Sequence, residues 1–435
     1  MRTAAYLCVH GIGVHDSGAL AEDVAACITT AAEELGGSAE PLPAEPDAPA
    51  ELVHRAQINL PQREPFIAEF YDGWWTRRVR RPRFWTVLLW TLRIAPLTLL
   101  NTASLWFRDR VFSRGRSSRG LLTALLPAAL FALLAAASVL LLPVLLGLTA
   151  AIPALRSRAQ TVVVDFIGDA WLYRSDELDH SVLPHLTSLA RTARSLADTV
   201  VLVGHSQGAE LTRRAGLRLT RHHPDDGGFR FVWVGSGENQ LNTVRALART
   251  RYLPLVFWPY LLGWPLLVHV MLSPASPLWP GMQPAGRLGA AVLALAVYFV
   301  AGVLMTRLIS RPPRDMGQLP GGLSWYVQSI LDPVSYGSAA VRGPAHRPEA
   351  VAVRYVPRHA GRPWWMEHVT YFEKPETGHT LLEAGLEVPE PLAPELPPQV
   401  PVWVLALCAA AVAALLGLGW LVGDWQWQLL DPLGA

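Results

Sequence analysis

The chain has 435 residues, of which 51% are hydrophobic and 17% are charged, and its net charge is +2. An ordinary soluble domain has about 25% charged residues, so the composition excludes a disordered or fibrous chain and disfavours a purely soluble one. The near-zero net charge gives no indication of nucleic-acid binding. Because Cys8, Cys27 and Cys408 form no C-x-x-C pair, we predict neither a disulfide framework nor a metal site.

The amino-terminal segment predicts the first elements of an α/β domain. Residues 4–9 (AAYLCV) form an apolar run that predicts a buried strand, and a helix is expected over 18–36. Segment 37–50 is rich in Pro and Glu without periodicity, so we interpret it as a loop, and 66–71 (FIAEFY) predicts another strand. The first apolar run is too short for a signal peptide, so we expect the amino terminus to stay in a reducing cytoplasm.

Five long apolar runs interrupt this pattern. They cover residues 84–107, 121–155, 252–272, 288–306 and 402–423. A membrane-spanning helix needs about 20 apolar residues, and tryptophans flank the first, third and last runs as in an interfacial belt. We therefore predict membrane insertions at 84–155, with two spans, and at 252–309, a hairpin, followed by a carboxy-terminal span at 402–423.

The remaining segments, 1–75, 160–250 and 315–400, together predict one discontinuous α/β domain of about 250 residues. Further strands are expected at 199–204, 229–235, 324–331 and 350–356, and further helices at 178–197, 207–222 and 238–250. The strands are apolar throughout, as parallel strands covered by helices on both faces must be.

One motif carries chemistry. The strand at 199–204 runs into Gly204-His205-Ser206-Gln207-Gly208, and a helix-like stretch follows. This is G-x-S-x-G in the strand-turn-helix setting that it requires. The glycines allow a sharp, strained turn that leaves the serine exposed at the start of a helix, where backbone N–H groups favour developing negative charge.

A second glycine loop follows the first strand, in Val9-His10-Gly11-Ile12-Gly13. With the GHSQG elbow, this VHGIG loop resembles the α/β-hydrolase superfamily of serine hydrolases. The resemblance covers the non-membrane segments and implies an α/β-hydrolase fold, a mostly parallel sheet flanked by helices. It also implies an oxyanion hole with one N–H from Gln207 and one from the loop, at Ile12 or Gly13. The membrane runs depart from the usual soluble pattern, and no subfamily is indicated.

The resemblance implies the order serine, acid, histidine along the chain. Asp332 directly follows the strand at 324–331, which makes it our choice for the acid; Glu238, after the previous strand, is the alternative. The base is expected after the last strand, where we favour His368 over His359. His205 occupies the variable position of the elbow, where we expect it to pack or line the site.

These residues predict that Ser206 attacks an acyl carbonyl, His368 moves the proton and Asp332 orients the imidazole, without a cofactor. The hairpin at 252–309 lies where this superfamily carries its lid, so we expect a lipid-like ester or thioester substrate taken from the bilayer. An acyltransferase on the same triad and a non-catalytic membrane scaffold or transport component remain alternatives. The sequence indicates neither the substrate nor the oligomeric state.

Arginines predict the orientation of the spans. Basic residues flank the 252–306 hairpin on its two outer ends, while the loop 273–287 carries only Arg287, which places the hydrolase domain on the cytoplasmic side of the plasma membrane. The arginines between 108 and 119 would then lie outside, against the rule. The alternative lays 84–107 on the membrane surface and folds 121–155 into a tight hairpin.

Overall fold

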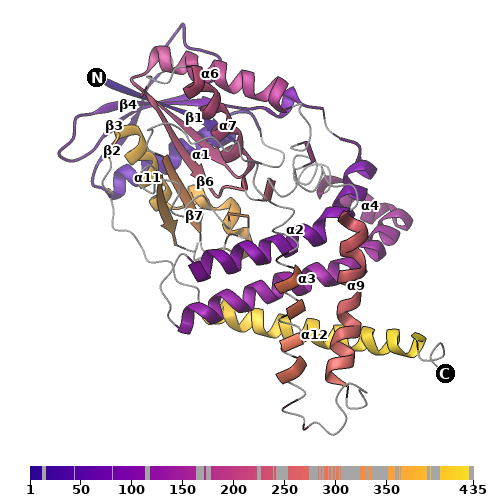
Figure 1. The fold of residues 1–435 in the computed structure, drawn as a ribbon. Coiled ribbons are helices and arrows are strands. Elements are labelled where there is room, and N and C mark those ends of the chain that lie inside the picture. Colours follow the sequence, from indigo (N-terminus) through magenta and orange to yellow (C-terminus); the bar gives the residue numbers. More distant parts are fainter. Residues whose placement is uncertain are drawn as a thin grey trace. The chain divides into compact units, whose positions relative to one another are not determined.

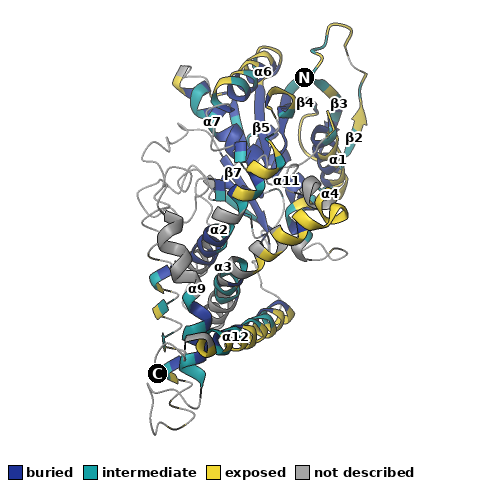
Figure 2. Cartoon of the chain, turned by 90° about the vertical axis from the view of Figure 1, so that its right-hand side faces the viewer, coloured by how far each residue is buried: buried dark blue, intermediate teal, exposed yellow. Residues whose placement is uncertain are grey.

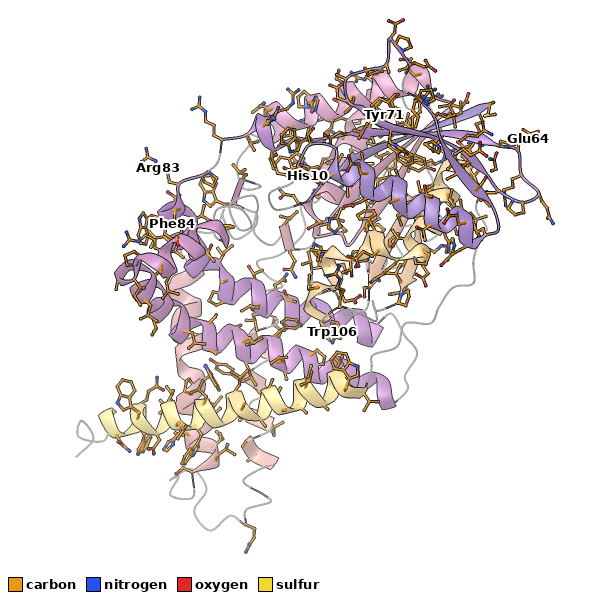
Figure 3. All side chains as sticks on the ribbon, turned by 180° about the vertical axis from the view of Figure 1, so that it is seen from behind. His10, Glu64, Tyr71, Arg83, Phe84 and Trp106 are labelled. Carbon is orange, nitrogen blue, oxygen red and sulfur yellow. The ribbon has the colours of Figure 1, made fainter. Side chains whose placement is uncertain are left out.

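The computed structural model divides into two compact units, drawn in Figure 1. The sheet unit comprises Met1–Arg83, Val164–Leu241 and Pro313–Gln399, and the helical unit comprises Phe84–Val163, Asn242–Pro312 and Val400–Ala435. Figure 3 labels Arg83 and Phe84 at the first boundary. The structure describes residues 1–11, 16–43, 45–80, 82–112, 118–162, 171–172, 178–222, 227–238, 240–241, 253–273, 324–329, 332, 334–335, 351–357, 362, 364–388, 392, 402–430 and scattered positions between 283 and 304.

The sheet unit is built on an eight-stranded sheet in the order β2-β3-β4-β1-β5-β6-β7-β8. Six neighbouring strands are parallel, and β2 and β3 extend one edge as an antiparallel pair. The strands are β1 (Arg2–Val9), β2 (Ser38–Pro41), β3 (Leu52–Asn59), β4 (Phe66–Asp72), β5 (Thr199–His205), β6 (Phe229–Val234), β7 (Ser324–Ser329) and β8 (Val351–Val356). The predicted α/β class with a mostly parallel sheet is therefore confirmed.

All six strands predicted from apolar runs form strands. The interpretation of 37–50 as a loop is wrong at its start, because Ser38–Pro41 pairs with the Ala56–Asn59 end of β3. The sequence has no apolar run at this position, because β2 is a half-exposed edge strand that contains Glu40 and Pro41.

Helices cover both faces of the sheet. Helices α1 (Ala19–Glu34) and α11 (Pro375–Leu386) bury one apolar cluster with the sheet, and α6 (Leu183–Leu196) and α7 (Gln207–His222) bury the other. A π-helical turn, Leu178–Val182, precedes α6. Figure 2 shows the central strands as buried between these layers. The central parallel strands are thus buried on both faces of the sheet.

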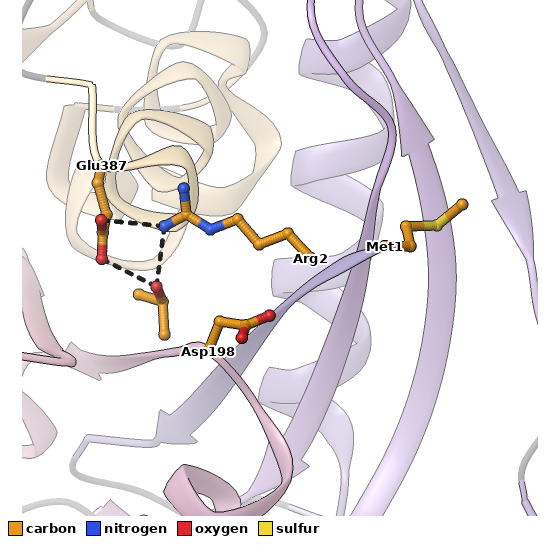
Figure 4. A pocket seen from close by; sticks show the side chains of 5 residues that line it. Met1, Arg2, Asp198 and Glu387 are labelled. Carbon is orange, nitrogen blue, oxygen red and sulfur yellow. Dashed lines mark hydrogen bonds and ion pairs between the residues drawn. The ribbon is translucent and has the colours of Figure 1, made fainter.

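A polar network connects the amino ends of the central strands (Figure 4). Arg2 forms an ion pair of 3.1 Å with Glu387 and donates to the Thr199 hydroxyl at 2.9 Å. Arg230 reaches the same carboxylate at 3.0 Å. These contacts join the amino ends of β1, β5 and β6 to the end of α11. Arg2, Thr199 and Glu387 also line a pocket of about 490 Å³.

The helical unit contains the predicted membrane runs. Its described helices are α2 (Phe84–Phe112), α3 (Ser118–Ala151), α4 (Pro153–Val162), α9 (Leu253–Leu272) and α12 (Val402–Leu430). A single helix occupies 118–151, which disfavours the tight-hairpin alternative. Gly419 and Gly423 let α12 approach α9, because a Cβ at Gly419 would lie 2.2 Å from the Trp264 ring.

By length and composition, one helix in the described part of the chain, Val402–Gln428, could cross a membrane. The segments Phe84–Thr91 and Ile94–Ser104 would add a second if they form one span, although they bend by 49°. The other predicted spans, the multi-pass arrangement and its orientation remain predictions.

Candidate active site

The turn between β5 and α7 holds Ser206 in a strained conformation. Its φ is 55°, in the left-handed region that non-glycine residues adopt at a cost of about 1–3 kcal/mol. The flanking glycines are required by space: a Cβ at Gly204 would lie 2.5 Å from Ala209 Cα, and one at Gly208 would lie 2.0 Å from the Val9 carbonyl oxygen. The sequence motif therefore forms the sharp elbow that it predicts.

The three residues predicted as nucleophile, base and acid come together in the structure. His368 Nε2 lies 2.8 Å from Ser206 Oγ, and His368 Nδ1 lies 2.9 Å from Asp332 Oδ2. The histidine belongs to a 3₁₀ helix, η6 (Trp364–Val369), that follows β8, whereas Asp332 follows β7. One hydrogen-bonded chain at the carboxyl ends of the strands thus joins three side chains that are far apart in the sequence. Ser206 lies 126 residues before Asp332, and Asp332 lies 36 residues before His368.

Asp332 is fully buried, and its carboxylate accepts hydrogen bonds from two further donors besides His368. The Val334 amide donates to Oδ1 at 2.8 Å, and the Tyr371 hydroxyl donates to Oδ2 at 2.8 Å. Burial acts to raise the pKa of Asp332, but the charge and hydrogen bond of His368 and these two donors outweigh it. The pKa of Asp332 is therefore lowered from its usual value of 3.8, and the carboxylate is ionised at neutral pH.

Tyr371 is a site residue that sequence reasoning missed. Besides donating to Asp332, its oxygen accepts the Ser329 amide at 2.7 Å. Burial, together with the charge of Asp332, raises the pKa of Tyr371 well above its usual value, so the hydroxyl keeps the proton that it donates. Its position three residues after His368 was visible in the sequence, but nothing in the local pattern indicated a contact with Asp332.

The loop after β1 lies against the nucleophile. A Cβ at Gly11 would lie 2.5 Å from Ser206 Cβ, so only glycine fits there. His10, shown in Figure 3, stacks on Trp75 with 5.3 Å between ring centres, and its Nδ1–H donates to the Gly11 carbonyl at 2.9 Å. The predicted loop donors, Ile12 and Gly13, lie outside the described residues.

The other predicted oxyanion donor is Gln207, which begins α7 and is fully buried. Its backbone N–H belongs to the first turn of the helix, where the helix dipole favours negative charge. The elbow thus puts a helix amino terminus directly after the Ser206 hydroxyl, as the sequence analysis expected.

The alternative acid, Glu238, has other partners. Tyr326 donates its hydroxyl to Glu238 Oε2 at 3.2 Å, and Arg213 lies 3.5 Å from Oε1. Within the described residues Glu238 makes no hydrogen bond or ion pair with His368, whose ring nitrogens contact Asp332 and Ser206. The alternative base, His359, lies outside the described residues.

His205 supports the base. Its ring lies 5.0 Å from that of His368 at an angle of 28°, and its Nε2–H donates to the His368 carbonyl at 2.8 Å. A carbonyl can only accept, so this contact fixes the tautomer of His205. His205 therefore packs beside the site, as we expected from its place in the elbow.

In the described residues no group of three or more His, Cys, Asp or Glu side chains is arranged to hold a metal ion. The side chains at the site are a serine, a histidine and an aspartate linked by hydrogen bonds. Such an arrangement can deprotonate the serine hydroxyl while it attacks an electrophilic centre. Comparison with family models, curated proteins and solved structures finds no match to this chain.

Proposed function

We propose that the protein is a membrane-embedded serine hydrolase that cleaves acyl ester or thioester bonds of lipid-like substrates. The observation that carries the proposal is the chain Ser206–His368–Asp332, with hydrogen-bond distances of 2.8 and 2.9 Å. These distances match those required of a nucleophile, a general base and the group that orients the base.

The mechanism follows from the contacts. Ser206 Oγ attacks the acyl carbonyl while His368 Nε2 takes its proton; the imidazolium then gives that proton to the leaving group, which departs and leaves an acyl-serine. Water attacks the acyl-serine by the same steps and regenerates the serine. Asp332 keeps the proton on His368 Nδ1 and stabilises the imidazolium, and the Gln207 amide stabilises the oxyanion.

The order of the elements supports membership of the α/β-hydrolase superfamily. The serine follows β5 at the centre of the sheet, the acid follows β7 and the histidine follows β8. This is the order serine, acid, histidine of that superfamily, with the serine on a strand-to-helix elbow. In open parallel sheets, the carboxyl edge of the strands is also where ligands bind.

The proposed membrane association is supported by α12 and by the apolar runs of the helical unit. Large apolar side chains of α12 are exposed, among them Leu407, Leu421 and Trp425, which suits contact with lipid. We further propose several spans with the sheet unit in the cytoplasm, on the basis of the arginines that flank the 252–306 segment. The insertion between β6 and β7 is then a membrane hairpin in the position of a lid.

Burst kinetics test the proposed chemistry. With a p-nitrophenyl ester, the full chain should release p-nitrophenol in a burst equal to the enzyme concentration, and Ser206→Ala should show none. Ser195→Ala, which changes an exposed serine of α6, is the matched control and should behave as wild type. Absence of Ser206-dependent release from folded protein would refute the hydrolase and favour the scaffold.

The lipid preference needs its own comparison. We expect the rate of hydrolysis of one ester to rise sharply when that ester passes from monomers to micelles. Equal rates on the soluble and the micellar ester would refute the preference for lipid-like substrates. Adding a lipid alcohol separates hydrolysis from acyl transfer, because a transferase would form the new ester at the expense of the free acid.

Reporter fusions test the proposed topology. Alkaline phosphatase, which is active only outside the cytoplasm, should be active when fused after Ala435 and inactive when fused at Arg314. The reverse pattern would contradict the proposed orientation.

A further inference from the structure

A buried ion pair lies directly beside the residue that carries the base. Lys374 Nζ is 2.7 Å from Glu367 Oε2, and the two side chains are 3% and 0% exposed. Lys374 is the only lysine in the chain, and Glu367 immediately precedes His368. Burying two charges has a large desolvation cost, so such a pair is weak evidence for stability and calls for another explanation.

A residue of the sheet contacts the same Glu367 oxygen. Ser329, the last residue of β7, donates its hydroxyl to Glu367 Oε2 at 2.8 Å. Its backbone N–H donates to the Tyr371 oxygen, whose hydroxyl donates to Asp332. One serine therefore contacts both sides of the site: through Glu367 it reaches the segment of the base, and through Tyr371 it reaches the acid.

The lysine is anchored to the helices that cover this face. Its carbonyl accepts the Thr377 amide of α11 at 3.0 Å and the Cys27 thiol of α1 at 3.4 Å. Its ammonium group lies 5.2 Å from the centre of the Tyr371 ring. Glu367 is thus held between the end of β7 and a residue fixed to α1 and α11.

The segment that carries the base needs such support. His368 lies in the 3₁₀ helix η6, and a second 3₁₀ helix, η7 (Tyr371–Glu373), follows at once. Short 3₁₀ helices have poor hydrogen-bond geometry and little stability of their own. Val369, the residue after the base, is 55% exposed, so apolar packing at that position does not hold the segment.

We propose that Ser329, Glu367 and Lys374 are positioning residues for His368, acting through the backbone of η6. The ion pair and the serine hydroxyl fix Glu367, and thereby hold the adjoining His368 ring between Asp332 Oδ2 and Ser206 Oγ. The proposal rests on the proposed serine hydrolase function, because that function requires the His368 ring to be placed precisely.

Ser329→Ala is the first test, because it removes one hydroxyl and leaves the ion pair and the strand intact. Ser324→Ala is the matched control: it lies at the other end of β7 and is equally buried. The measured quantity is the second-order rate constant for labelling of Ser206 by a fluorophosphonate probe. We expect a fall of about 10- to 100-fold for Ser329→Ala, the size that a misplaced catalytic group produces, and no change for Ser324→Ala.

Hydrolysis of p-nitrophenyl butyrate separates positioning from a general structural effect. Ser329→Ala should lower kcat with KM close to that of wild type. Because the variant also loses a buried hydrogen bond to the Glu367 carboxylate, the rates are measured at a temperature where denaturant titration shows it to be folded. Lys374→Met alone leaves a buried charge without its partner, so the double variant Glu367→Gln/Lys374→Met, which removes both charges, is the second test. It should fold and label slowly; labelling of both variants within twofold of wild type would overturn the proposal.

A spectroscopic readout distinguishes failure of this inference from failure of the proposed function. The His368 Nδ1–H bonded to Asp332 should give a low-field proton resonance that is missing in Asp332→Asn. Loss of this resonance in Ser329→Ala supports positioning even if wild type is not labelled. An unchanged resonance in Ser329→Ala overturns positioning even if wild type is labelled.

Discussion

Replacing Tyr371 by phenylalanine removes one buried hydroxyl that forms hydrogen bonds with Asp332, Ser329 and Ser335. The hydroxyl donates to Asp332 Oδ2 at 2.8 Å and accepts the Ser329 amide at 2.7 Å. A hydrogen bond to a charged group contributes about 1.5–3 kcal/mol, and an amide left buried without a partner costs about 1–3 kcal/mol. We therefore expect Tyr371→Phe to lower the free energy of unfolding by about 2.5–6 kcal/mol.

The same change should slow the reaction. Without the Tyr371 donor, the Asp332 carboxylate is less well fixed and its pKa rises, so it orients His368 less firmly. We expect the rate of fluorophosphonate labelling of Ser206 to fall by about tenfold or more. Labelling is measured at a temperature where denaturant titration shows the variant to be folded, so that loss of stability and loss of reactivity are separated.

Tyr71→Phe is the matched control. Tyr71 lies near the end of β4, is fully buried and donates to Glu69 at 2.8 Å, not to a residue of the Ser206–His368–Asp332 chain. It should lose about 1.5–3 kcal/mol of stability and keep the wild-type labelling rate. If Tyr371→Phe also kept the wild-type rate, or lost no more stability than Tyr71→Phe, the reasoning about the Asp332 environment would be refuted.

Three further predictions follow from the site. Asp332→Asn should lower kcat by about 10⁴-fold, as loss of the orienting acid does in serine-hydrolase triads. Glu238→Gln should keep most of the activity, because Glu238 contacts Tyr326 and Arg213. The opposite result would reverse the assignment of the acid. Gly208→Ala should cost about 1–3 kcal/mol in thermal unfolding because its Cβ meets the Val9 carbonyl, whereas Gly227→Ala, where a Cβ meets nothing, should be neutral. The pKa of Asp332 is lower in the folded state than in the unfolded state, where it is about 4. The stability that this carboxylate contributes is therefore present above about pH 4 and is lost as the pH falls through the folded-state pKa. Between about pH 5 and pH 2, wild type should lose more stability than Asp332→Asn.

The sequence predicted those parts of the fold that local patterns determine. Apolar runs located all six parallel strands, because strands buried on both faces need apolar residues throughout. The edge strand β2 was missed since half-exposed residues such as Glu40 give no such signal. Strand β3 also went unpredicted; its register shifts between Leu52 and His54, which interrupts the alternation of buried side chains.

The site shows the same division. Ser206 could be predicted because the elbow needs glycines at fixed spacings, and Asp332 and His368 because the resemblance gives their order along the chain. Tyr371 and Ser329 could not be predicted, because their contacts with each other and with Asp332 and Glu367 span 38 to 42 residues of sequence. A lone lysine is uninformative until the structure shows that it is buried against Glu367.

Mass spectrometry of the fluorophosphonate-treated full chain tests the central claim most directly. We expect a single adduct on the peptide that contains Ser206, formed rapidly in wild type and slowed by more than about 10³-fold in His368→Ala. An adduct on another serine, or equal labelling of Ser206 in wild type and in folded His368→Ala, would contradict it.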